Sequence, residues 1–136
     1  MIEQVESKLA FNIITTEQNS FLVDVRTQEE FSFVGVVDDS VFKNKSILLP
    51  WLIYPNMDEN PEFANNISDS IADKEAKIFF LCRTGARSNS AAQFCKNIGY
   101  QNCYNIANGF EGDLNNNRQR GLVNGWKAAN LGWKQS

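Results

Sequence analysis

The chain has 136 residues, of which 43% are hydrophobic and 21% charged, with a formal net charge of -3. These values are typical of a soluble globular protein with one core. The sequence contains no histidine, which excludes Ser-His-Asp and Cys-His catalysis within the chain and histidine-ligated metal sites.

Alternating helical and strand patterns predict an α/β fold with a central, mainly parallel sheet. The first helix is predicted over residues 7–14, whose apolar positions share one helical face, and a buried strand over 21–25. Thr27 and Glu30 then have the spacing of a capping box, so a short helix should begin at Thr27 and carry Phe31 inward. In this interpretation Glu30 is a helix cap and not a catalyst.

The second half of the chain continues the alternation. The tail from Gly109 onward is rich in glycine and asparagine, which predicts loops, with Trp126 and Trp133 fixing them to the body. We expect one domain over residues 1–136, with a core of about 5–112 and a C-terminal extension, 113–136, packed on it. The predicted elements are a strand at 47–49 ended by Pro50, a helix from Pro61, a strand at 77–81, a helix at 88–98 stopped by Gly99, and a strand at 102–106.

The segment CRTGARS, residues 82–88, places a cysteine between a predicted strand and a predicted helix. A loop that curls over a helix start directs backbone N–H groups to one point, and Gly85 permits the turn. With Arg83 and Arg87 nearby, this environment favours the thiolate of Cys82 without a histidine base.

The other two cysteines, Cys95 and Cys103, lie in apolar surroundings and are predicted to be core residues. The odd number of cysteines and their spacing argue against a disulfide framework or a zinc site, and we expect no cofactor. Residues 1–76 hold fourteen acidic and five basic side chains, whereas 77–136 hold two acidic and eight basic ones. This asymmetry reflects either chance or a positive surface near Cys82 for anionic partners.

No lysine- and arginine-rich run is present, so no nucleic-acid partner is expected. No apolar segment reaches the ~20 residues that cross a bilayer. The N-terminal residues also lack the pattern of a secretory signal. We therefore expect a cytoplasmic protein without a membrane partner.

These motifs together resemble those of the rhodanese-like sulfurtransferases. The resemblance rests on VDVRTQEEF at 23–31, CRTGARS at 82–88 and GYQNCYNIANGFEG at 99–112, and the tail looks like the ending of a bacterial single-domain branch. It implies a three-layer α/β domain in which Cys82 carries a sulfane sulfur as a persulfide. A segment of the Gly-His-Ile-Pro-Gly-Ala type is replaced by a different sequence across Gly35–Tyr54. Substrate choice, and a role for Trp51 and Tyr54 at the entrance or in the core, therefore stay open.

The length of the loop between Cys82 and Arg87 distinguishes the sulfurtransferase interpretation from that of a cysteine-dependent phosphatase. Those enzymes use Cys-x5-Arg, whereas Cys82 and Arg87 are spaced as Cys-x4-Arg, a tighter ring that suits an outer sulfur better than a phosphate ester. Phosphatase activity is the weaker hypothesis, and a sulfur-carrying module with little turnover is the other alternative.

The resemblance implies a double displacement through Cys82. The expected partners are a small anionic sulfur donor such as thiosulfate and a thiol or cyanide acceptor, with a protein acceptor also open. Arg83 and Arg87 would attract the donor, and Asp24 would brace the loop or an arginine. The predicted site consists of Cys82 as nucleophile, the substrate-binding loop Arg83, Thr84, Gly85, Ala86 and Arg87, and the supporting residues Asp24, Arg26 and Ser88.

Overall fold

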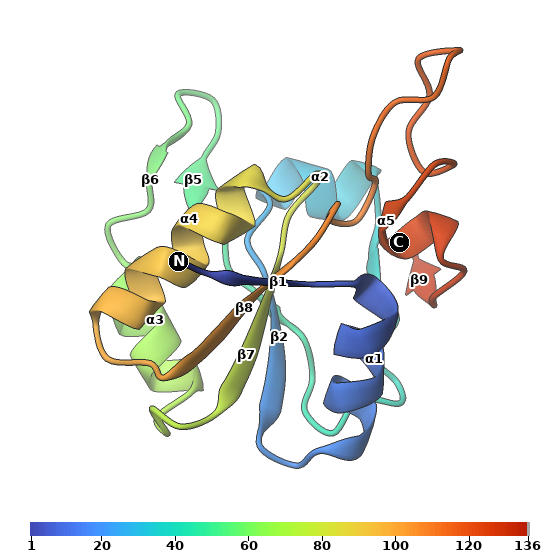
Figure 1. Cartoon of the computed structure of the whole chain (residues 1–136). Helices are drawn as coiled ribbons and strands as arrows, with labels where there is room; N and C mark the ends of the chain where they lie inside the picture. The colour runs from blue at the N-terminus through green and yellow to red at the C-terminus, as the bar shows by residue number, and fades with distance from the viewer. Residues whose placement is uncertain (136) are drawn as a thin grey trace.

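The computed structural model of the protein describes residues 1–135. Its centre is a five-stranded sheet of order β1-β8-β7-β2-β4, in which every neighbouring pair is parallel (Figure 1). The predicted α/β class with a parallel sheet is confirmed. The strands are β1 (Glu3–Val5), β2 (Ser20–Asp24), β4 (Ile47–Leu48), β7 (Lys77–Leu81) and β8 (Asn102–Ile106).

Helices cover both faces of this sheet. α3 and α4 pack on one face, and α1 and α5 lie on the other (Figure 1). Among residues 1–135, no helix is both long and apolar enough to cross a membrane. The helices are α1 (Ser7–Thr16), α2 (Gln28–Phe33), α3 (Phe63–Ser70), α4 (Ala86–Asn97) and α5 (Gly125–Ala128). Two small antiparallel pairs join β3 (Val36–Val37) to β9 (Trp133–Lys134) and β5 (Leu52–Ile53) to β6 (Asp58–Glu59).

Alternation along β7 divides the core into two clusters. Ile78 and Phe80 pack toward α3 and α4, and Phe79 and Leu81 pack toward α1 and α5. Both faces are fully buried, which explains why the strand reads as a continuous apolar run. Cys82 continues the alternation on the α3/α4 side. Cys82 directly follows β7, so the alternation of the strand sets the side of the sheet on which its thiol lies.

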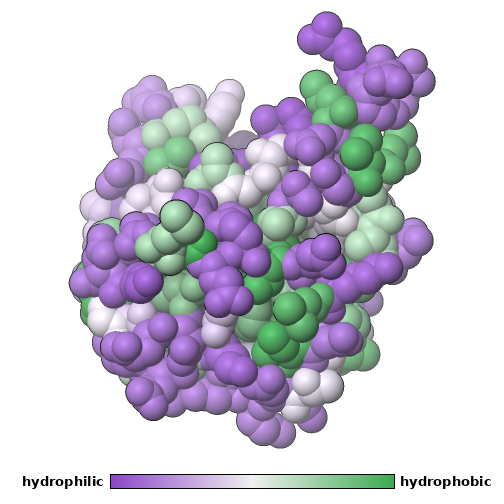
Figure 2. Space-filling model, in the orientation of Figure 1, coloured by the Kyte–Doolittle hydropathy of each residue, from purple (hydrophilic) through white to green (hydrophobic). Residues whose placement is uncertain are grey.

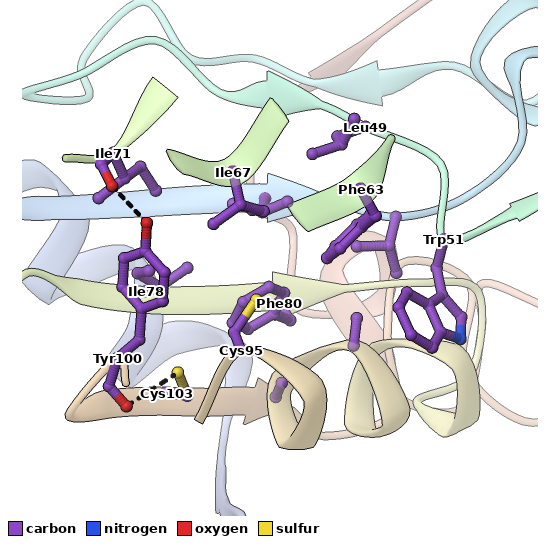
Figure 3. Packing of buried hydrophobic residues seen from close by; sticks show 14 of the residues in the cluster. Leu49, Trp51, Phe63, Ile67, Ile71, Ile78, Phe80, Cys95, Tyr100 and Cys103 are labelled. Atoms are coloured by element: carbon purple, nitrogen blue, oxygen red, sulfur yellow. Dashed lines mark hydrogen bonds between the residues drawn. The ribbon is translucent and has the colours of Figure 1, made fainter. Parts of the chain in front are cut away.

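The α3/α4 cluster contains the two remaining cysteines (Figure 3). Cys95 comes from α4 and Cys103 from β8, and both are buried and free. Tyr100 crosses the same cluster, and its hydroxyl donates to the carbonyl of Ile71. Burial raises the pKa of Cys95 to about 12 and that of Cys103 to about 11. Both thiols therefore stay protonated and behave as core side chains, as predicted.

The capping box predicted at the start of α2 is present. The backbone N–H of Glu30 donates to Thr27 Oγ1 at 3.2 Å, and the N–H of Thr27 donates to Glu30 Oε1 at 3.1 Å. Phe31 is buried, as expected. The helix predicted after Pro61 is α3, and it begins at Phe63.

The segment after β8 returns to the body through Trp126. This side chain is fully buried and lies 6.0 Å from the ring of Phe11 and 6.3 Å from that of Phe42. Trp133 is instead 39% exposed and pairs through β9 with β3. Between β8 and α5 a loop projects from the body (Figure 1), and Figure 2 shows apolar side chains on it within a mostly hydrophilic surface. Its exposed apolar residues are Leu114, Leu122 and Val123.

The strand order reverses between β2 and β7. Asp24 at the end of β2 is in register with Leu81 at the end of β7. From β2 the chain proceeds to β4, and from β7 it proceeds in the opposite direction to β8. Crevices of open α/β sheets form where the strand order reverses in this way. Cys82, the residue after β7, therefore lies at the expected place for a ligand.

Candidate functional site

The loop after β7 is short and turns sharply at Gly85. Gly85 has φ of +119°, a conformation that side chains resist, and it serves as the N-cap of α4. Its backbone N–H donates to Cys82 Sγ at 3.1 Å. α4 begins at Ala86, two residues earlier than the sequence predicted, because the turn at Gly85 is complete there. Arg87 and Ser88 consequently lie in the first helical turn.

The sulfur of Cys82 is enclosed by the protein. The residue is only 1% exposed, and Ser88 Oγ lies 3.2 Å from Sγ. Ser88, predicted as a supporting residue, is itself fully buried. Access to this thiol therefore suits a slender group better than a bulky one.

The segment after β8, residues 109–112, supports the Cys82 loop through its backbone, and we call it the floor segment. The N–H of Phe110 donates to the carbonyl of Cys82 at 2.8 Å, and the N–H of Glu111 donates to that of Arg83 at 3.0 Å. Gly109 has φ of +62°, and a Cβ there would lie 2.4 Å from the Cys82 carbonyl oxygen. Only glycine allows this approach, so GYQNCYNIANGFEG supplies a backbone surface on which the loop rests.

Arg87 is held by an ion pair with Glu30. Its Nη1 and Nη2 donate to Oε1 and Oε2 of Glu30 at 2.6 and 2.9 Å. Burial raises the pKa of Glu30, but hydrogen bonds from Arg87 and Thr27 outweigh it and lower this pKa to about 2. The hydrogen bond to Glu30 raises the pKa of Arg87, and the nearby Cys82 adds to that effect. Glu30 is therefore a helix cap, as predicted, and also the partner of Arg87, which sequence reasoning missed.

Asp24 and Arg26 form a second, fully buried ion pair. Arg26 Nε donates to Asp24 Oδ1 at 2.9 Å and Nη2 donates to Oδ2 at 2.7 Å. Nη2 also donates to the carbonyl of Gly35 at 2.8 Å, and the guanidinium lies 4.3 Å from the ring centroid of Phe110. Burial raises the pKa of Asp24 despite its partner. Of the two alternatives for Asp24, bracing an arginine is the one seen.

The outer part of the loop faces solvent. Arg83 and Ala86 are exposed, and Thr84 is half-buried. The carbonyl of Arg83 accepts from the Glu111 N–H, and the residue itself is exposed. The loop thus combines a buried sulfur with an exposed positive charge, and Arg87 contributes a second charge that Glu30 offsets.

The Gly35–Tyr54 segment divides between core and surface. Trp51 is buried, with its ring 5.0 Å from that of Phe63, which answers the open question in favour of the core. Tyr54 is 59% exposed. A cavity of about 260 Å³ between the β5–β6 hairpin and the start of α2 is lined by Thr27, Gln28, Glu29, Pro50, Leu52, Ile53, Tyr54 and Asn60. Within residues 1–135, no three His, Cys, Asp or Glu side chains are grouped to hold a metal ion.

Asn105 is a further polar residue at the site that sequence reasoning did not single out. It lies in β8, is 3% exposed, and accepts a hydrogen bond from Ser88 Oγ. The available signal was a polar residue between Tyr104 and Ile106, near the end of a predicted strand.

Comparison with known proteins identifies the family and the fold. The family model of the rhodanese-like domain matches residues 8–116. An uncharacterised protein of Rickettsia conorii is 44% identical over 136 residues, covering 98% of each chain. A protein of Ogataea parapolymorpha described as an adenylyltransferase and sulfurtransferase is 27% identical over 104 residues, which are 76% of this chain and 22% of that protein.

Two solved structures extend the comparison. The crystal structure of Rv0390 from Mycobacterium tuberculosis has a TM-score of 0.88 and 31% identity, with 98% of each chain covered. The polysulfide-sulfur transferase homodimer of Wolinella succinogenes has a TM-score of 0.67 and 18% identity over 99% of this chain and 80% of that one. The second similarity concerns the fold alone.

Proposed function

Because the chain belongs to the rhodanese-like domain family, we propose that it is a sulfurtransferase that passes a sulfane sulfur through a persulfide on Cys82. The observation that carries the proposal is the loop itself. A buried cysteine at the carboxyl edge of β7 receives the Gly85 N–H at 3.1 Å within a Cys-x4-Arg ring.

The proposed reaction has two displacements. The Cys82 thiolate attacks the outer sulfur of an anionic donor such as thiosulfate, and an S–S bond forms to Sγ. The donor's own S–S bond breaks, and its electron pair leaves with the anion, sulfite in the case of thiosulfate. An acceptor thiolate or cyanide then attacks the outer sulfur, the S–S bond to Sγ breaks, and its electron pair regenerates the thiolate.

The loop residues have distinct proposed roles. Arg83, exposed at the rim, attracts the anionic donor. Arg87, paired with Glu30, places positive charge near Cys82. Thr84, Gly85 and Ala86 supply the backbone that surrounds the transferred sulfur.

A carrier of sulfur with little turnover is the second candidate. The observation that favours it is the burial of Cys82, at 1% exposure, because a shielded persulfide is delivered slowly to small acceptors. A protein acceptor would then remove the sulfur. Both candidates use the same persulfide, and they differ in the rate of the second displacement.

Mass spectrometry after treatment with thiosulfate tests the proposal. A gain of about 32 Da on the Cys82 peptide is expected, with none in Cys82→Ser and an unchanged gain in folded Cys95→Ser. Release of thiocyanate on adding cyanide identifies the enzyme, and a loaded but unreactive persulfide identifies the carrier. A gain on Cys95 or Cys103 instead, or hydrolysis of an aryl phosphate, would overturn the assignment.

A further inference from the structure

Asn105 connects the Cys82 loop to the edge of the sheet. Its Nδ2 donates to the carbonyl of Gly85 at 3.0 Å and to Gln4 Oε1 at 2.8 Å. Its Oδ1 accepts from Ser88 Oγ at 2.5 Å. One buried amide therefore contacts both residues that touch the sulfur, Gly85 through its backbone and Ser88 through its hydroxyl.

The direction of these hydrogen bonds is fixed by groups that only accept. The Gly85 carbonyl cannot donate, so the NH2 of Asn105 must face it and Oδ1 must face Ser88. Gln4 gives the same answer independently. Its Nε2 donates to the carbonyl of Ile2 at 3.2 Å, which turns Gln4 Oε1 toward Asn105. Ser88 must therefore be the donor to Asn105.

This arrangement decides what Ser88 offers to the sulfur. A hydroxyl has one proton, and that of Ser88 is directed to Asn105, with the Gly85 carbonyl a second acceptor at 3.2 Å. Cys82 Sγ, 3.2 Å away, then faces a lone pair of Ser88. A thiol donates its S–H to that lone pair, whereas a thiolate gains nothing from it until the Ser88 hydroxyl turns.

We propose that Asn105 is a positioning residue that withholds the Ser88 proton from Cys82 while Sγ is uncharged and releases it when the thiolate forms. In a persulfide the negative charge is on the outer sulfur, so Sγ is uncharged and the Ser88–Asn105 hydrogen bond persists. When the acceptor takes the outer sulfur, the electron pair stays on Sγ and the Ser88 hydroxyl turns to it. Asn105 thereby favours the loaded form over the bare thiolate, and this last step rests on the proposed sulfurtransferase function.

Other charged groups around Cys82 stay unchanged in the variants that test this. They are Arg83 and Arg87 from the loop and α4, Asp24 and Arg26 at the end of β2, Glu30 from α2, and Glu111 from the floor segment.

The test is the pH profile of iodoacetamide labelling of Cys82, which uses no sulfur donor. Asn105→Ala frees the Ser88 proton, so the midpoint is expected to move about one pH unit lower, a tenfold change in the thiol–thiolate balance. Ser88→Ala should move it higher by a similar amount, and Asn105→Ala should add no effect in that background. Asn102→Ala is the matched control, because Asn102 lies on the same strand but donates to the Glu75 carbonyl.

Asn105→Leu, which is similar in size, repeats the measurement if Asn105→Ala does not fold. An unchanged midpoint in either folded variant overturns the proposal, as does a shift that persists in the Ser88→Ala background. An upward shift would also overturn it, because Asn105 would then act only by holding Gly85. Separately, the ratio of persulfide to thiolate at fixed thiosulfate and sulfite should fall about tenfold in Asn105→Ala. Absence of any persulfide in the unaltered protein refutes the proposed function and leaves the labelling result independent.

Discussion

Replacing Glu30 with glutamine isolates the charge of the ion pair that holds Arg87. Glutamine keeps the shape of the side chain and still accepts from the Thr27 N–H, so the start of α2 is retained. The pKa of Glu30 lies at about 2 instead of its ordinary 4.5, which corresponds to about 3 kcal/mol at most. Solvent screening reduces this value because the carboxylate side chain remains 20% exposed. We therefore expect Glu30→Gln to lower the free energy of unfolding at neutral pH by about 2 kcal/mol.

The loss should depend on pH in a defined direction. Because the pKa of Glu30 is lower in the folded than in the unfolded state, its contribution is complete above about 4.5 and fades as pH falls toward about 2. Urea unfolding followed by tryptophan fluorescence, at a series of pH values, measures the difference between the two proteins. That difference should shrink progressively below about pH 4.5.

Glu29→Gln is the matched control, because Glu29 is the adjacent exposed acid in the same helical turn. It should change the free energy of unfolding by less than about 0.5 kcal/mol. The reasoning is refuted if both variants lose equal stability, or if the loss in Glu30→Gln is the same at neutral and acidic pH.

Three further predictions concern residues around the loop. Iodoacetamide at neutral pH should label Cys82 in the folded protein and leave Cys95 and Cys103 unmodified, because burial raises their pKa to about 12 and 11; labelling of all three without denaturant would contradict this. Gly109→Ala should lower the free energy of unfolding by about 1–3 kcal/mol and reduce the persulfide yield, because the new Cβ would lie 2.4 Å from the Cys82 carbonyl oxygen. An unchanged melting temperature and an unchanged mass gain would show that the segment after β8 does not support the Cys82 loop. Trp126→Ala should lower the free energy of unfolding, measured by calorimetry, by about 3–5 kcal/mol, since this fully buried ring belongs to the core cluster that packs toward α1 and α5. A small loss would show that the C-terminal extension contributes little to stability.

Local patterns were sufficient for most of the fold. The apolar run at β7 and the capping box at Thr27 each depend on a few adjacent residues, so the sequence displays them directly. Gly85 likewise marked a turn whose conformation few other residues adopt. The carboxyl-edge position of Cys82 followed from strand–loop–helix order alone.

Contacts between segments far apart in the sequence could not be predicted from such local patterns. The pairing of Glu30 with Arg87 joins residues 57 apart, and Asn105 meets Gln4 across 101 residues. From the sequence alone, each residue already has an ordinary structural role. Glu30 caps a helix, and Asn105 is a polar residue in a strand. Only the folded arrangement, in which α2 and β8 approach the same loop, selects the partner. The hairpin β5–β6 was not predicted, and its strands have only two residues each.

The pairing of β3 with β9 gives the order of synthesis a consequence for folding. β3 can pair only after Trp133 and Lys134 of β9 have been synthesised. The core cluster that packs toward α1 and α5 is complete only after Trp126 has been added. During translation the strands of the five-stranded sheet and the Cys82 loop are synthesised before these residues. The nascent chain therefore passes through a stage in which the apolar surface later covered by Trp126 is open to solvent, and surfaces of this kind are the ones that chaperones bind.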